Sequence, residues 1–305
     1  MIQWYPGHMH KAKKEFQKIL PQADLVIEVL DARIPYSSQN PLLALLRKDK
    51  PCIKLLNKSD LADKSIVSKW QIQLERDSSV KTLICHHGDV LTRKLPELCR
   101  SMIPARDNRS NMIYALIVGI PNVGKSTLIN KLAGRNVTKT GNEAALTRMQ
   151  QRIEINTDLM LIDTPGMLWP KIENENSGYR LAATGAIRDT AINLQEVACF
   201  IAEFMLAHYP GITLQRYALQ ALPNTDVELL EAIAKKRGCI VSGGKVDYEK
   251  VSRLLVSELR NGDLGGVCLE TPEMIDRELA ELEIIKAQNL VKLAAKKAAR
   301  QAEKK

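Results

Sequence analysis

Residues 119–126 read Gly-Ile-Pro-Asn-Val-Gly-Lys-Ser and fit the pattern G-x-x-x-x-G-K-[ST] of a phosphate-binding loop. An apolar run at 113–118 predicts a buried strand before the loop, and residues 127–132 have the pattern of a helix after it. A glycine-rich turn between a strand and a helix is the alternative, but it does not explain Lys125 and Ser126 at these positions. The chain is therefore expected to be an α/β protein built around a nucleotide phosphate site.

The residue types in the loop suit different parts of a bound nucleotide. Backbone N–H groups turn inward on the α- and β-phosphates, Lys125 reaches the β- and γ-phosphate oxygens, and the Ser126 hydroxyl is a ligand for Mg²⁺. Lys125 is thus expected to act in catalysis as well as in binding. The nucleotide contacts predicted in and beside the loop are Asn122, Val123, Gly124, Lys125, Ser126 and Thr127.

A second motif, Asn57-Lys58-Ser59-Asp60, follows an apolar run at 52–56 that reads as a strand. A carboxylate at Asp60 can accept hydrogen bonds from N1–H and the 2-amino group of guanine. Adenine offers neither donor, so a pocket built on this carboxylate rejects ATP by leaving a buried charge unpaired. The tetrapeptide alone is common on protein surfaces, but together with the phosphate loop it predicts GTP.

A third motif, Asp163-Thr164-Pro165-Gly166, follows the second strand of a hairpin predicted at 152–156 and 159–162. Asp163 is expected to hold Mg²⁺ through water, and the Gly166 N–H to sense the γ-phosphate. The polar stretch 136–148 contains Thr147, which we expect to contact both nucleotide and metal. The stretch after this motif, as far as Ser177-Gly178, is predicted to be a mobile switch.

The order of the motifs is unusual. In ordinary small GTPases the phosphate loop comes first and N-K-x-D last, whereas here N-K-x-D precedes the loop and D-x-x-G ends the series. This order predicts a circular permutation, with the usual termini joined by a linker at 104–111. A permuted domain is opened at a new point, here just after the second switch, which is the segment that follows Asp163-Thr164-Pro165-Gly166. The nucleotide state therefore has a short covalent route to both flanking segments, which favours a switch over a metabolic enzyme.

Composition divides the chain into three parts. A basic N-terminal segment at 1–18 precedes a permuted GTPase domain at 19–178, which has a central, mostly parallel sheet with helices on both faces; a smaller all-helical domain at 179–305 ends in a basic tail. With 44 Lys and Arg against 35 Asp and Glu, a polyanionic partner is expected. Aromatic residues are only 4%, which favours contacts to phosphates over base stacking. The tail's charges fit either a helix dipole or an RNA-binding arm.

Six scattered cysteines without a C-x-x-C pair argue against disulfides and zinc, so reduced core residues are expected. The sequence shows no signal peptide, and the apolar run 197–207 is short and interrupted by Glu203. A cytoplasmic protein without a membrane partner is predicted.

The chain resembles the permuted ribosome-assembly GTPases of the YlqF/RbgA family. The resemblance rests on the three motifs, on Asp31-Ala32-Arg33, and on residues 4–9 (Trp-Tyr-Pro-Gly-His-Met) and 181–187 (Leu-Ala-Ala-Thr-Gly-Ala-Ile). It implies GTP hydrolysis coupled to late maturation of the large ribosomal subunit through ribosomal RNA, with GTP, GDP and Mg²⁺ as ligands; we expect a monomer. A nucleotide-gated RNA-binding scaffold with incidental hydrolysis is the alternative, and Asp60 disfavours an ATP-using phosphotransferase. Taken alone, Asp31 and Arg33 are predicted to pair at a strand end.

Catalysis by this chain must differ from that of Ras-type enzymes, because Met167 stands where they place a water-orienting Gln. Slow turnover is expected without a partner. His8, which the family resemblance supports as a catalytic residue, is expected to position the water once the ribosome orders the N-terminal segment; a phosphate-contacting or packed His is the alternative. Asn122 matches potassium-activated GTPases, so K⁺ is a candidate ion, against a purely loop-shaping role. Cys85 and His86 are expected beside the base, where relatives carry small residues.

Overall fold

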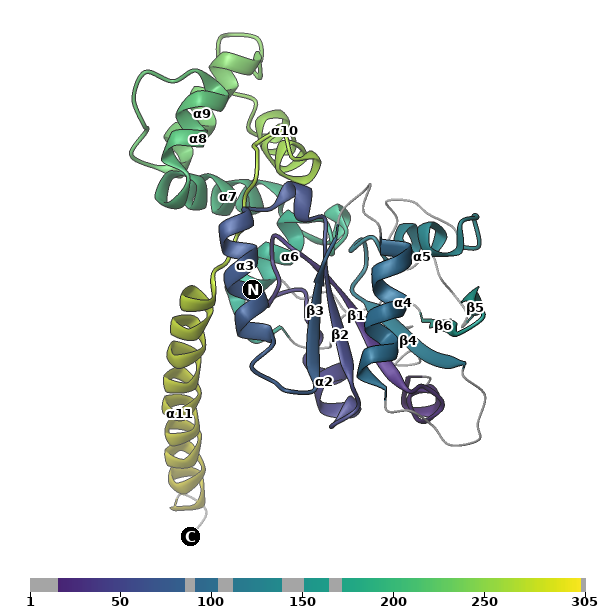
Figure 1. The fold of residues 1–305 in the computed structure, drawn as a ribbon. Coiled ribbons are helices and arrows are strands. Elements are labelled where there is room, and N and C mark those ends of the chain that lie inside the picture. Colours follow the sequence, from purple (N-terminus) through teal and green to yellow (C-terminus); the bar gives the residue numbers. More distant parts are fainter. Residues whose placement is uncertain (1–15, 86–90, 104–111, 139–150, 165–171, 303–305) are drawn as a thin grey trace.

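The computed structural model describes residues 16–85, 91–103, 112–138, 151–164 and 172–302. At its centre is a six-stranded sheet in the order β3-β2-β1-β4-β6-β5, parallel except for β5, which pairs antiparallel with β6 (Figure 1). The strands are β1 (Leu25–Asp31), β2 (Cys52–Asn57), β3 (Val80–Ile84), β4 (Ile113–Gly119), β5 (Gln151–Asn156) and β6 (Leu159–Asp163). The predicted hairpin at 152–162 is confirmed.

Helices cover both faces of the sheet. Leu25, Ile27 and Val29 of β1 pack with α4 and α5, whereas Val26 and Leu30, which point to the opposite face, pack with α2 and α3. Burial on both faces explains why β1 reads as a continuous apolar run instead of an alternating one. These helices are α2 (Pro41–Arg47), α3 (Lys64–Leu74), α4 (Leu91–Met102) and α5 (Lys125–Ala133). The α/β class is confirmed.

The second half of the chain is helical, as predicted. In Figure 1, α7 to α10 gather above the sheet, and α11 extends away from them as a long separate helix. The bounds are α6 (Glu175–Ala183), α7 (Leu194–His208), α8 (Pro210–Tyr217), α9 (Asp226–Arg237), α10 (Tyr248–Asn261) and α11 (Pro272–Ala302).

Helix α7 begins at Leu194 because the Asn193 side chain caps it, and Pro210 occupies the first position of α8. One sequence expectation about this half needs correction. The switch expected to reach Ser177-Gly178 cannot extend so far as an irregular segment, because Asn174 caps α6 and both residues lie buried inside it. The proposed domain border after residue 178 therefore falls within a helix.

Of the helices in the described ranges, none is by itself long and apolar enough to cross a membrane, and the single pair that meets this criterion jointly, α7 with α8, is bent by 114°. All six cysteines are free thiols, and five of them are buried, as expected for core residues.

Candidate nucleotide-binding site

The three motifs meet at one edge of the sheet. The phosphate loop follows β4, the Asn57-Lys58-Ser59-Asp60 motif follows β2, and Asp163 ends β6, so all three stand at carboxyl ends of neighbouring parallel strands. Beyond β1 the chain adds β2 and β3, and beyond β4 it adds β6 and β5, which makes the β1–β4 boundary the topological switch point. Ligands of open α/β sheets bind in the crevice at such a point.

The Asn57-Lys58-Ser59-Asp60 motif, called the base-recognition motif from here on, is bonded directly to the phosphate loop. Asn57 Nδ2 donates to Val123 O at 2.8 Å, and Lys58 Nζ donates to Asn122 O at 2.8 Å. Gly124 has a φ of +94°, and a Cβ at this position would collide with Asn57 Nδ2. Residue 124 must therefore be glycine for the two motifs to approach each other. Asp60, next to them, is exposed and available to a ligand.

Lys125 and Asp163 form a buried ion pair beneath the loop. Their side chains are 6% and 0% exposed. The next residue, Thr164, donates from its hydroxyl to Ile117 O at 3.0 Å, which fixes the end of β6 against the strand that carries the loop. The predicted phosphate-binding lysine and the predicted metal-binding carboxylate are thus neighbours, and a bound phosphate would share the Lys125 ammonium with Asp163.

The oxygen donors at this site fit Mg²⁺. Ser126 lies in the first turn of α5 and Asp163 at the end of β6, and both offer the hard oxygens that this ion prefers. The described residues hold no cluster of three or more His, Cys, Asp or Glu side chains suited to a metal. Magnesium in nucleotide sites takes only one or two protein ligands and completes its shell with phosphates and water. The site therefore suits a metal that arrives with the nucleotide.

Cys85 braces the base-recognition motif. Its thiol is buried and lies 3.6 Å from Asn57 Oδ1, while its carbonyl oxygen accepts from Ser59 N at 3.2 Å and Ser59 Oγ at 3.0 Å. A contact between Cys85 and the base stays a prediction. The predicted site residues His8, His86, Thr147 and Gly166 lie outside the described residues.

Asn122 connects the phosphate loop to the helical half of the chain. It has a φ of 58°, and its Nδ2 donates to Gly185 O at 2.8 Å. Gly185 belongs to the Leu-Ala-Ala-Thr-Gly-Ala-Ile segment at 181–187, whose first three residues end α6. This contact supports a loop-shaping role for Asn122, and a potassium-binding role stays a prediction. The described stretch 136–138 is also anchored, since Thr138 Oγ1 donates to Ser126 O at 3.1 Å.

Sequence reasoning identified the Asp31–Arg33 pair but not its neighbours. Arg33 pairs with Asp31 as predicted: its Nε donates to Asp31 Oδ1 at 2.9 Å and its Nη2 donates to Asp31 Oδ2 at 2.7 Å. Lys58 Nζ also donates to Asp31 Oδ2, at 3.1 Å. The pair is thus bonded to a residue of the Asn57-Lys58-Ser59-Asp60 motif. The parallel pairing of β1 with β2 was the available signal, because it places Asp31 opposite Asn57.

A phosphate loop at the switch point, a guanine-type Asn-Lys-x-Asp motif bonded to it and a carboxylate beside its lysine together define a P-loop GTPase. Residues 114–235 match a family model described as 50S ribosome-binding GTPase. The chain is 44% identical over 281 residues to ribosome biogenesis GTPase A of Bacillus licheniformis, covering 90% of this chain and 99% of the relative. It is 42% identical over 292 residues to the Bacillus cereus protein of the same name, covering 93% and 99%.

A solved structure is similar over the same extent. The GNP-bound crystal structure of YlqF from T. maritima superposes with a TM-score of 0.62 at 28% identity, covering 87% of this chain and 99% of that one. The chain therefore belongs to the ribosome biogenesis GTPase A family, which includes YlqF. It binds guanine nucleotides and hydrolyses GTP. The order of its motifs along the chain is consistent with the permuted arrangement expected from the sequence.

Proposed function

We propose that this GTPase is a molecular switch that binds ribosomal RNA in precursors of the large ribosomal subunit and acts in a late step of their assembly. The names of its relatives supply the ribosomal context. One observation supports the switch function most strongly: Asn122 Nδ2 of the phosphate loop donates a hydrogen bond to Gly185 O of the helical region at 2.8 Å. A change at the γ-phosphate therefore has a direct route to the helices. The protein acts as a monomer in the cytoplasm.

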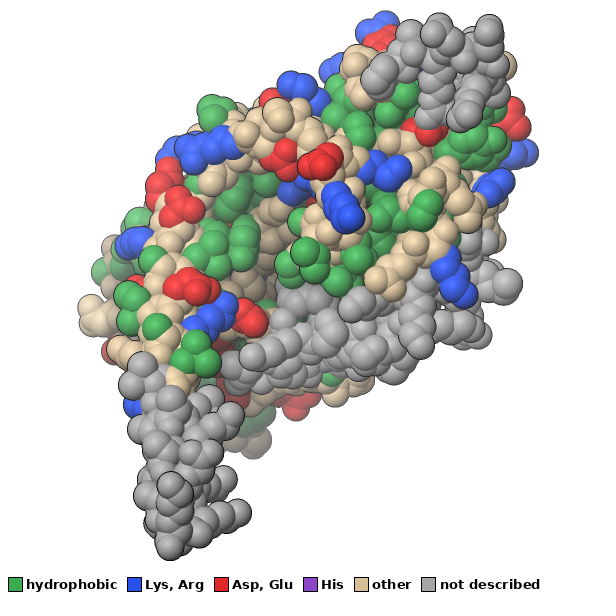
Figure 2. Space-filling model, turned by 90° about the horizontal axis from the view of Figure 1, so that it is seen from below, with side chains coloured by type: hydrophobic (Ala, Val, Ile, Leu, Met, Phe, Trp, Pro, Cys, Tyr) green, Lys and Arg blue, Asp and Glu red, His purple; other side chains and the backbone are tan. Residues whose placement is uncertain are grey.

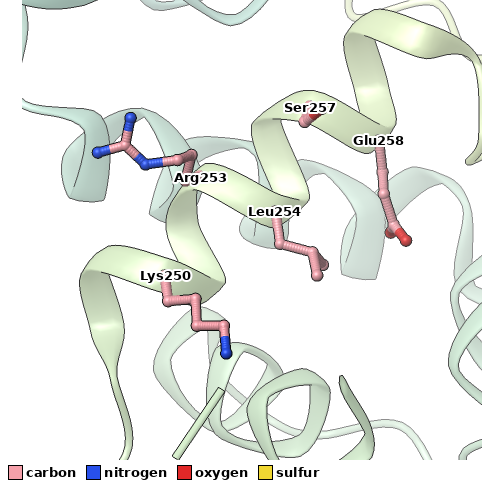
Figure 3. Close-up of a pocket in the computed structure, with 5 residues that line it drawn as sticks. All are labelled: Lys250, Arg253, Leu254, Ser257 and Glu258. Carbon is pink, nitrogen blue, oxygen red and sulfur yellow. The ribbon is translucent and has the colours of Figure 1, made fainter. Parts of the chain in front are cut away.

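The RNA contact is proposed on the helical region and its tail. Basic residues end α9 and continue along α10: Lys235, Lys236, Arg237, Lys250 and Arg253. A cavity of about 380 Å³ opens along α10, where Lys250, Leu254 and Glu258 project to the same side (Figure 3). On the face drawn in Figure 2, the described Lys and Arg side chains are interspersed with Asp and Glu. The basic end of α11 adds an arm for RNA phosphates.

The residues at the loop have distinct tasks in hydrolysis. Lys125 holds the β- and γ-phosphate oxygens and stabilises the charge that develops there. Ser126 and Asp163, with Thr147, would hold Mg²⁺, which would neutralise phosphate charge. Gly166 donates its N–H to the γ-phosphate. Met167 cannot orient the attacking water, and this task is assigned to His8.

The effect of ribosomal particles on the rate tests the proposal. We expect large ribosomal subunits to raise the GTPase rate by about 10²-fold or more, because a positioned general base contributes about 10²–10⁴-fold. His8→Ala should keep GTP affinity and lose most of the stimulated rate, while His10→Ala serves as the neighbouring control. Phosphate release measured with and without subunits gives both results. A rate that subunits do not change at any salt concentration would contradict the assembly role, and full stimulation of His8→Ala would exclude His8.

A further inference from the structure

Asp31, which ends β1, and Arg33, just after it, form a buried ion pair outside the three nucleotide motifs, and Lys58 of the second motif joins them. Asp31 accepts from Arg33 Nε at 2.9 Å, from Arg33 Nη2 at 2.7 Å and from Lys58 Nζ at 3.1 Å. Arg33 and Asp31 are only 1% and 2% exposed. Burying charges is costly, and an apolar replacement of a buried ion pair is often just as stable. The stability of the fold alone therefore does not account for this cluster.

Lys58 joins the cluster to the phosphate loop. Its ammonium donates both to Asp31 Oδ2 and to Asn122 O, at 3.1 and 2.8 Å. A lysine carries its charge on a flexible four-carbon stem and can reach many positions. The Asp31 carboxylate selects the position from which the ammonium also bonds the loop backbone. Lys58 thus holds the loop only while Asp31 holds Lys58.

Arg33 fixes the carboxylate in turn. Its planar guanidinium binds both carboxylate oxygens, and its Nη1 donates to Leu259 O at 3.0 Å, near the end of α10. Burial by itself would raise the pKa of Asp31, but Arg33 and Lys58 outweigh it and hold that pKa well below its usual range. The carboxylate is therefore ionised wherever the protein binds nucleotide.

We propose that Asp31 and Arg33 are positioning residues for the nucleotide. Arg33 orients the Asp31 carboxylate, and Asp31 keeps the Lys58 ammonium on the backbone of the phosphate loop. Their place at the carboxyl end of β1, beside β4, is the switch point where the ligand binds. Without the carboxylate the ammonium swings away, the loop loses its bond at Asn122 O, and the nucleotide leaves faster. This role concerns the pocket alone and stands independently of the ribosomal role.

Asp31→Asn tests the proposal because it keeps the shape of the side chain and removes its charge. We expect a fluorescent GDP to dissociate about 10- to 100-fold faster, the range for losing a charge-assisted hydrogen bond. Lys58→Gln should also speed release, and the double variant should exceed the larger single effect by no more than about twofold, since both act on one contact. Stopped-flow mixing with excess GDP gives all four rates. Effects that multiply would show that Asp31 does not act through Lys58.

A remote ion pair provides the control. Arg47 and Asp77 pair at 2.6 Å beside the amino ends of β2 and β3, at the edge of the sheet opposite the site. Asp77→Asn should leave GDP release within about twofold of wild type. If Asp31→Asn does not fold, Arg33→Lys replaces it; this variant keeps the charge but cannot hold Asp31 and Leu259 O together, and should speed release about 3- to 10-fold. A lower melting temperature with an unchanged release rate would mean a purely structural role and overturn the proposal.

Discussion

Lys125→Ala is expected to lower the rate of GTP hydrolysis by about 10²–10³-fold, the scale measured when one donor to a developing charge is removed. Lys125 is the cation of the phosphate loop, and it is buried against Asp163. The same change should also lower the free energy of unfolding by about 3–5 kcal/mol, because it leaves the Asp163 carboxylate buried without its cation. Single-turnover hydrolysis and thermal melting measure the two effects separately.

The kinetic measurement should be made well below the melting temperature, where circular dichroism shows that the variant is folded. Lys131→Ala is the matched control, because Lys131 is a partly buried lysine on the same helix, α5, but in its last turn. We expect this control to hydrolyse GTP at nearly the wild-type rate. A folded Lys125→Ala protein with wild-type turnover would contradict the phosphate role of the loop lysine.

Asp60→Asn is expected to change the base that the pocket prefers from guanine to xanthine. Losing two charge-assisted hydrogen bonds to guanine, worth roughly 1.5–3 kcal/mol each, should weaken GTP binding by about 10²–10⁴-fold. Xanthine carries a carbonyl where guanine carries the 2-amino group, so the side-chain amide that the substitution introduces can donate an N–H to it. The variant should therefore bind xanthosine triphosphate better than GTP, while wild type prefers GTP.

Calorimetric titration with GTP, ATP and xanthosine triphosphate measures this exchange. Because Asp60 is exposed, its replacement should change the free energy of unfolding by less than about 0.5 kcal/mol, and a folding defect does not complicate the result. Wild-type protein that binds ATP as tightly as GTP would contradict the guanine pocket. An Asp60→Asn protein that keeps its preference for GTP would remove Asp60 from base recognition.

The sheet and most of the site could be predicted because their signals are local. Each motif is a short run directly after an apolar strand, and parallel strands bring their carboxyl ends together without further information. The bond between Lys58 and Asn122, and the collision that requires glycine at position 124, follow from this arrangement but are not visible in the spacing.

The links between the two halves of the chain could not be predicted from the sequence. Arg33 reaches Leu259 across 226 positions, and Glu270, fully buried, accepts from the backbone N–H of Ser37 across 233 positions. Such contacts depend on how the helical region packs, and no periodic pattern encodes that packing. Similarly, the predicted switch reached too far because the polar residues that cap and begin α6 read as an irregular segment.

Binding of the protein to large ribosomal subunits in defined nucleotide states tests the central claim most directly. Purified protein is mixed with subunits and either a non-hydrolysable GTP analogue or GDP, and the fraction that sediments with the subunits is measured. We predict that the protein sediments with the subunits when it carries the analogue and stays in the supernatant when it carries GDP. The same distribution in both states, or no binding in either, would contradict a switch that links GTP to ribosome assembly.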